Sequence, residues 1–127
     1  MIDLLEVAKS YLEGLGYEGV WLKRLDEFTG HEGIVLRRMP ETVTDRYMDR
    51  SFASDYVWQA IVVRRSEREA IETCEELARA LRFAPLDSIN GSYRLVENDV
   101  YTAPQEMAAD EEGFFSWQVQ FTAHIWR

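Results

Sequence analysis

The feature that most constrains this chain is an abrupt change of hydrophobic period at Ser66. From Asp55 to Arg65, successive side chains alternate between two faces of an extended segment, and both faces are largely apolar. One face carries Tyr56, Trp58, Ala60 and Val62, and the other carries Val57, Gln59, Ile61 and Val63. Because both apolar faces must be covered by other parts of the protein, this segment is predicted to be a central strand of a sheet.

After Ser66, the apolar residues recur every three or four positions. They form one helical stripe: Ala70, Ile71, Cys74, Leu77, Ala78 and Leu81. Ser66 and Glu69 also have the spacing of a capping box. The pattern therefore predicts a helix over Glu67–Arg82, with its stripe packed against the sheet.

A second amphipathic helix is predicted near the N-terminus, from Asp3 to Leu15. Its apolar stripe consists of Leu4, Leu5, Ala8, Tyr11, Leu12 and Leu15. Asp3 and Glu6 have the spacing of a capping box at its start, and two glycines, Gly14 and Gly16, are suited to end it.

The rest of the chain reads as short strands and two irregular segments. Strands are predicted at residues 19–25, 33–39, 92–101 and 114–126, and the last of these alternates apolar and polar side chains. Residues 40–54 are interpreted as a long loop or an extended hairpin arm, and residues 102–113 as a second irregular stretch. The order is α-β-β-β-α-β-β, which indicates an α+β fold: a mixed or antiparallel sheet with two helices packed on one face. We expect residues 1–127 to form a single domain.

Composition excludes several classes of protein. One cysteine rules out an intrachain disulfide and a cysteine zinc cluster. No window approaches the ~18 apolar residues of a membrane span, and an acid lies where a signal peptide would carry positive charge. We therefore expect a soluble protein made in the cytoplasm, without membrane contact. The net charge of −9 argues against specific nucleic-acid binding.

No set of residues for catalysis is recognisable. The two histidines, His31 and His124, have no motif that supplies a partner, and the acidic run at residues 110–112 lacks the ligand spacing of a calcium loop. Cys74 falls on the helical stripe and is interpreted as a core thiol. Trp58 and Trp117 are also expected in the core. We expect neither a bound metal nor a cofactor, and no enzymatic activity.

The charges are unevenly distributed along the chain. The middle is rich in arginine: Arg37, Arg38, Arg46, Arg50, Arg64, Arg65 and Arg68. Residues 95–126 contain no Lys or Arg, but six acids: Glu97, Asp99, Glu106, Asp110, Glu111 and Glu112. The sequence thus carries two groups of opposite sign, which suits an interface between unlike patches.

The order of elements and a few turn residues resemble a known group of proteins. The segments that carry the resemblance are the strand Tyr56–Arg65 running into a helix that starts with Glu69-Ala70, the strand end Tyr101-Thr102-Ala103-Pro104, the stretch 105–113, and the final strand Phe115–Phe121. Together they resemble the minor capsid and tail-terminator proteins of tailed bacteriophages and prophages, over roughly Leu4 to Trp126. Met107-Ala108-Ala109 departs from the Leu-Gly often found before the Asp in that group.

The resemblance implies a structural role in a virion. Such proteins cap the tail tube as a hexameric ring and present a face to the head–tail connector protein. The expected partners are therefore further copies of the chain, the tail tube protein and the connector protein. The expected location is the tail of the virion, after assembly in the host cytoplasm. No catalytic residues come with the family.

A ring needs two different patches on each subunit, which suggests an interface from the charge split. We hypothesise that Arg64, Arg65 and an arm with Arg46 and Arg50 face an acidic loop of the neighbouring subunit. That loop contains Asp110, Glu111 and Glu112, and Trp126 is the candidate for an exposed aromatic anchor. Two alternatives stay open: a small α+β pocket enzyme or ligand-binding domain of the cone-shaped type, with His31 or His124 beside a carboxylate, and a head–tail junction adaptor.

Overall fold

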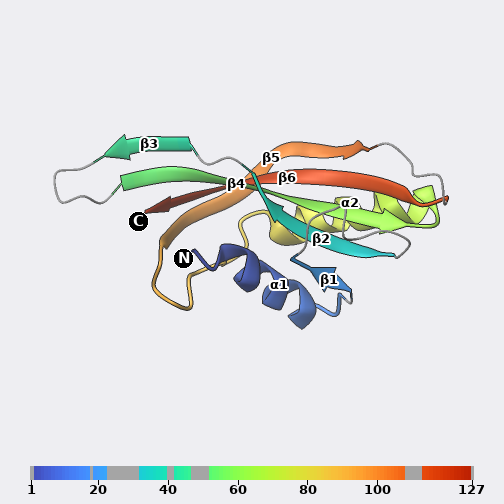
Figure 1. Ribbon diagram of the computed structural model, residues 1–127, viewed down its shortest axis with the longest axis horizontal. Coiled ribbons are helices and arrows are strands. Elements are labelled where there is room, and N and C mark those ends of the chain that lie inside the picture. Colours follow the sequence, from blue (N-terminus) through green and yellow to red (C-terminus); the bar gives the residue numbers. More distant parts are fainter. Residues whose placement is uncertain are drawn as a thin grey trace.

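A computed structural model describes residues 2–17, 19–22, 32–39, 42–46, 52–107 and 113–126. The described residues contain two helices, α1 (Leu4–Gly14) and α2 (Glu67–Leu81). The strands are β1 (Val20–Trp21), β2 (Gly33–Arg38), β3 (Thr42–Arg46), β4 (Phe52–Arg64), β5 (Arg94–Glu106) and β6 (Phe115–Trp126). Figure 1 shows their arrangement.

The strands form a single mixed sheet in the order β1-β2-β4-β6-β5. β1 runs parallel to β2, and every other pairing is antiparallel. β4 lies between β2 and β6, as its two apolar faces predict. The α+β class is confirmed, and the predicted helices and strands occur in the predicted order, with β3 as an additional strand.

Within the described residues of the stretch 40–54, β3 pairs antiparallel with the start of β4, which favours the second of the two interpretations, an extended hairpin arm. β3 pairs with the first residues of β4, from Thr42↔Asp55 to Arg46↔Phe52, so β4 begins three residues earlier than its hydrophobic pattern indicates. β3 is an additional strand of the sheet. Figure 1 shows β3 and the start of β4 extending beyond both helices.

β5 is longer than predicted, because it continues from Arg94 through Pro104 to Glu106. Proline normally ends a strand, since it lacks the N–H that a ladder requires, but it is tolerated on an edge strand. β5 is the terminal strand of the sheet, and its register with β6 shifts three times. The irregular sequence of residues 102–106 thus reflects a bulged edge strand rather than a loop.

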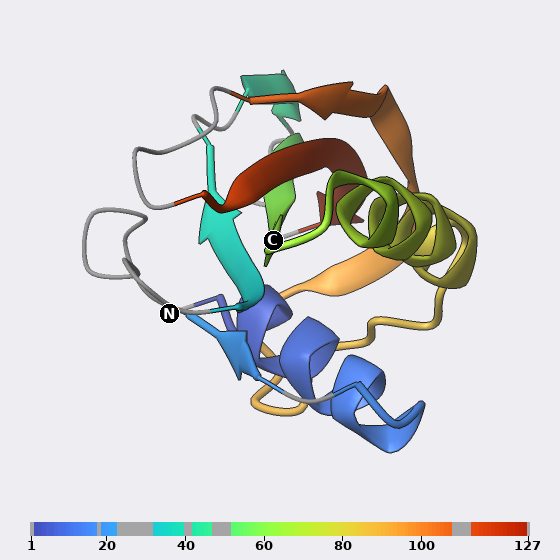
Figure 2. The same ribbon diagram turned by 90° about the vertical axis from the view of Figure 1, so that its right-hand side faces the viewer.

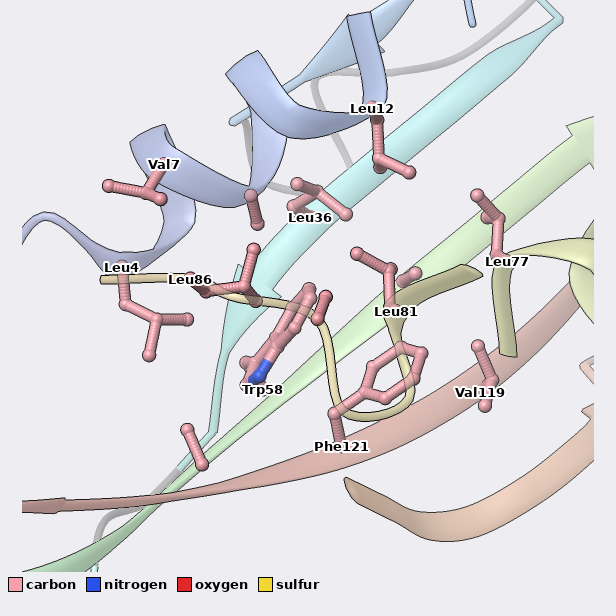
Figure 3. Close-up of a cluster of buried hydrophobic side chains, with 14 of the residues drawn as sticks. Leu4, Val7, Leu12, Leu36, Trp58, Leu77, Leu81, Leu86, Val119 and Phe121 are labelled. Carbon is pink, nitrogen blue, oxygen red and sulfur yellow. The ribbon is translucent and has the colours of Figure 1, made fainter. Parts of the chain in front are cut away.

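Both helices pack on one face of the sheet, as predicted, and share one core (Figures 2 and 3). Trp58 of β4 and Phe121 of β6 lie at its centre, fully buried, with ring centroids 4.7 Å apart. The core residues labelled in Figure 3 are Leu4, Val7, Leu12, Leu36, Trp58, Leu77, Leu81, Leu86, Val119 and Phe121. Burying one such side chain stabilises the fold by about 1.5–3 kcal/mol, so the helices are held mainly by this shared layer.

A buried amide, Asn98 of β5, connects three parts of this core. Its Oδ1 accepts a hydrogen bond from Trp58 Nε1 at 3.0 Å, and its Nδ2 donates to the Leu81 carbonyl at 2.8 Å. Its backbone carbonyl accepts from Phe83 N at 2.6 Å. Asn98 has no exposed surface, so these bonds replace water that the amide loses on folding. The side chain therefore fixes the end of α2 against β4 and β5.

Asp3 has a different role from the predicted helix cap. It occupies the N-cap position of α1, but its side chain makes no capping hydrogen bond. Its carboxylate instead accepts bonds from Ser88 Oγ at 2.8 Å, Ile89 N at 2.9 Å and Asn90 N at 3.1 Å. Asp3 thereby ties the start of α1 to the connection between α2 and β5. The Ser66 cap is confirmed: its Oγ accepts from Glu69 N at 3.4 Å.

Replacing Asn98 with alanine is expected to destabilise the protein by about 3 kcal/mol. The change leaves the Trp58 indole N–H and the Leu81 carbonyl buried without a partner, and each such group costs about 1–3 kcal/mol. Urea unfolding measures the effect, with Gln105→Ala on the exposed part of the same strand as control. In a double-mutant cycle, Asn98→Ala and Trp58→Phe should cost less together than the sum of the two changes. Strict additivity would show that the Trp58–Asn98 bond contributes nothing.

Asp3→Asn is expected to lower the free energy of unfolding at neutral pH by about 1–3 kcal/mol. It should also make this free energy vary less with pH in the acid range. Burial alone would raise the pKa of Asp3, but the hydrogen bonds from Ser88, Ile89 and Asn90 outweigh it and lower the pKa below the ordinary 3.8. The stabilisation is therefore complete above the ordinary pKa and is lost as the pH falls through the folded-state value. Unfolding curves at pH 7 and pH 3 test this, with exposed Asp87→Asn as control. An equal loss at both pH values would contradict it.

The Cys74 thiol is expected to resist alkylation in the folded protein. It is fully buried on α2, as the helical stripe predicts, and this burial raises its pKa to about 12, with a further contribution from the charge of Glu75. Since only the thiolate reacts, labelling by iodoacetamide at pH 8 should be negligible without denaturant and complete in urea. Rapid labelling of the folded protein, followed by mass spectrometry, would contradict this.

Candidate functional site

The residues of the hypothesised charged interface lie at two ends of the sheet. Arg64 and Arg65 are at the C-terminal end of β4, and Arg46 pairs with Phe52 at its N-terminal end. Because β4 has 13 residues, the two ends are about 40 Å apart at ~3.3 Å per residue. A single loop of a neighbour cannot meet both, so the sheet divides the hypothesised arginine group into two separate surfaces.

At the Arg64 and Arg65 end, both guanidinium groups have contacts within the chain. Arg64 Nη1 donates to the Val63 carbonyl at 3.0 Å, and Arg65 lies over the Phe114 ring at 4.9 Å from its centroid. Phe114 directly precedes β6, so Arg65 is held beside the N-terminal end of that strand. Arg65 is nevertheless exposed, whereas Arg64 is half-buried. Arg65 therefore places an accessible, fixed positive charge at this end of the sheet.

At the other end, Trp126 of β6 lies opposite Ala53 of β4 and Arg94 of β5. It is half-buried. Among the described residues, the exposed aromatic side chains are Trp21, Phe83 and Tyr101, which are exposed by 42%, 58% and 66%. Arg50, the acidic residues Asp110, Glu111 and Glu112, and His31 lie outside the described residues.

The face of the sheet opposite the helices carries a second, smaller apolar cluster. Val35, Ile61, Val63 and Phe114 are buried there, and Met107 packs against them. This cluster explains why β4 is apolar on both faces. Trp58 and Val62 pack in the core beneath the helices, whereas Ile61 and Val63 pack in the smaller cluster.

The middle of the same face is covered by uncharged polar side chains. Gln59 Nε2 donates to Gln118 Oε1, Gln120 Nε2 donates to the same oxygen at 3.4 Å, and Thr102 Oγ1 donates to Gln120 Oε1 at 3.2 Å. The four residues come from β4, β6 and β5. They form a hydrogen-bonded, uncharged polar band across three strands.

A histidine–carboxylate pair follows this band along the face. His124 Nδ1 lies 2.5 Å from Asp55 Oδ1, and both side chains are partly exposed. Sequence reasoning missed this partner because the two residues are 69 positions apart. Only the antiparallel register of β4 and β6 places them opposite each other. A strand-pairing prediction for the two longest alternating segments could have identified the pair.

Within the part of the chain that the structure describes, no group of three or more His, Cys, Asp or Glu side chains has the geometry of a metal site. Neither α1 nor α2 combines the length and hydrophobicity that a membrane crossing requires.

Comparison with known proteins finds a likeness in fold. No protein-family model matches the sequence, and no curated protein matches it. Among solved structures, the chain is similar to one in a structure described as "Virion of native gene transfer agent (GTA) particle". The two share 17% sequence identity and superpose with a TM-score of 0.65 over 98% of this chain and 95% of the other. At this level of identity the likeness establishes a shared fold.

Proposed function

We propose that this chain is a structural protein of a phage-like virion, and that it acts as a tail terminator. In this role it caps the completed tail tube as a hexameric ring and joins the tube to the head–tail connector protein. The single observation that carries the proposal is the likeness to a chain of the gene transfer agent virion, which extends over nearly the whole of both chains. The order of elements that resembles tail terminators supports the same role.

The separation of charge between the strands supports assembly through unlike patches. Arg65 is exposed at the end of β4, and β2 ends in the exposed Arg37 and Arg38. On the strand at the far side of the sheet, carboxylates outnumber the single arginine, Arg94. Complementary charges of this kind fix which surfaces meet and how they are aligned, more than they raise affinity.

We keep the hypothesis that Arg64 and Arg65 meet the acidic residues 110–112 of a neighbouring subunit, and we treat the Arg46 arm as a separate surface. This division follows from the length of β4. The arm then remains available for a different contact in the tail, with the tube protein or with the connector protein.

The proposal is tested by electron microscopy of the purified protein, alone and with the tail tube protein of the same particle. We expect rings, and we expect tubes to stop growing when the protein is added. Tubes that lengthen normally in its presence, with no ring at their ends, would contradict the role of terminator.

The interface hypothesis is tested by Arg64→Glu together with Arg65→Glu. Native mass spectrometry should show loss of the oligomer, or an oligomer whose salt sensitivity has changed, because reversed charges would face the acidic run. Arg68→Glu is the matched control: Arg68 is exposed on α2 and pairs only with Glu72 of its own helix turn among the described contacts. Unchanged oligomers with unchanged salt sensitivity in the double variant would remove the hypothesis.

A further inference from the structure

The large apolar side chains that are exposed in the described part of the chain gather at the two opposite edges of the sheet. One group lies at β1 and the end of α1: Trp21, Leu22 and Leu15. The other lies on β5 and beside it: Phe83, Val96 and Tyr101. Ile89, in the connection before β5, belongs to neither group. β1 and β5 are the two ends of the strand order β1-β2-β4-β6-β5, so the two apolar groups belong to different edges of the sheet.

Phe83 has a backbone conformation that its side chain makes costly. Its φ is +58°, in the left-handed region that glycine or asparagine usually occupies after a helix. A bulky residue there costs about 1–2 kcal/mol. Core packing does not compensate this cost, since the side chain is 58% exposed. Phe83 is therefore a strained residue on the surface, a combination that marks candidate functional positions.

The exposed ring is also held in place. The Phe83 N–H donates to the Asn98 carbonyl at 2.6 Å, and the Arg82 guanidinium lies 4.8 Å from the centre of the ring. Arg82 Nε is fixed in turn by Asp99 Oδ1 at 3.0 Å. An aromatic side chain that is already ordered loses little conformational entropy on binding. Rigid aromatic residues beside arginine are typical of the residues that dominate protein interfaces.

The two edges also differ in charge. β2, which flanks β1, ends in the exposed Arg37 and Arg38 and contains no acid. β1 pairs only with Ile34 and Val35, so this arginine end of β2 is itself at the edge of the described sheet. On β5, three of the four charged residues are acids: Glu97, Asp99 and Glu106, against Arg94. Asp99 is paired with Arg82 of the same chain, so the β5 edge offers Glu97 and Glu106 beside Arg94, whereas β2 ends in two arginines.

We infer that these two edges bind each other between neighbouring copies of the chain. The β5 edge, defined by Phe83, Val96 and Tyr101, docks on the β1 edge of the next copy, defined by Trp21 and Leu22. Arg37 and Arg38 of that copy then face Glu97 and Glu106 of β5, while Asp99 stays paired with Arg82 of its own chain and Arg38 lies over its own Tyr56 ring. Such a contact is head-to-tail. A row of copies joined in this way keeps one unbound edge at each end unless it closes into a ring. The inference rests on the proposed ring and names the surfaces that build it.

Cross-linking between introduced cysteines tests the contact directly. Leu22→Cys and Tyr101→Cys are placed together in one chain, and a short bis-maleimide is added to the folded protein. Both positions are exposed, whereas the native Cys74 is buried and does not compete. We expect a ladder of covalent oligomers beyond the dimer. Each single variant should give no covalent oligomer, and an equal mixture of the two should give covalent dimers only. Ile89→Cys paired with Tyr101→Cys is the control and should give no ladder.

The outcomes separate this inference from the proposed function. Dimers from either single variant would indicate a two-fold contact and overturn the head-to-tail arrangement. Rings in the microscope without a ladder would overturn the choice of edges but not the terminator role. A ladder from a protein that does not stop tube growth would support the edges and reject the terminator role. The absence of both rings and a ladder would reject the choice of edges and the terminator role.

Phe83→Asn gives a second, independent measurement. Asparagine accepts the left-handed backbone, so thermal unfolding of the monomer should occur at the same temperature as in the wild type, or higher. Self-association, measured by sedimentation velocity, should weaken about tenfold or more because the aromatic anchor is lost. Ile89→Ser, which removes the most exposed apolar side chain in the described residues, should leave association unchanged. Unaltered association in Phe83→Asn would overturn the role of this residue.

Discussion

The antiparallel pairing of β4 with β6 is the interaction on which the rest of the structure depends. It runs from Ala53↔Trp126 to Arg64↔Phe115 without a register shift. This register stacks Trp58 on Phe121 on the helical face and places His124 beside Asp55 on the other. A slip of one residue would exchange the two faces of β6 and expose its apolar side chains, so burial fixes the register strongly.

Two buried polar side chains position what surrounds this pair. Asn98 binds the end of α2 to the centre of the sheet, and Asp3 binds the start of α1 to the connection before β5. Each residue acts on parts of the chain that are far away in the sequence. Each also forms hydrogen bonds with backbone N–H or C=O groups that lack a partner at a helix end or in a buried connection. The apolar layer supplies most of the stability, whereas these two residues determine where each helix ends relative to the strands.

The remaining surfaces of the described residues differ from one another in charge and in exposed apolar area. The charge asymmetry along the chain becomes a difference between β2 and β5 at opposite edges of the sheet, because the strand order is not the sequence order. The hypothesised arginine group is divided between two surfaces, because Arg46 and Arg64 lie at opposite ends of β4. A strained, exposed Phe83 at one edge and Trp21 at the other add an apolar component to that difference.

Local periodicity by itself determined the two helices, the central position of β4 and the α+β class, because each depends on which residues within a short window must be buried. It also indicated Cys74 and Trp58 as core residues. Tertiary structure alone decided the partners of Asp3, Asn98 and His124, the continuation of β5 through Pro104, and the distance between Arg46 and Arg65. Those features depend on strand order and register, which are set by contacts between residues far apart in the chain. No local pattern of propensity or hydrophobic spacing contains that information.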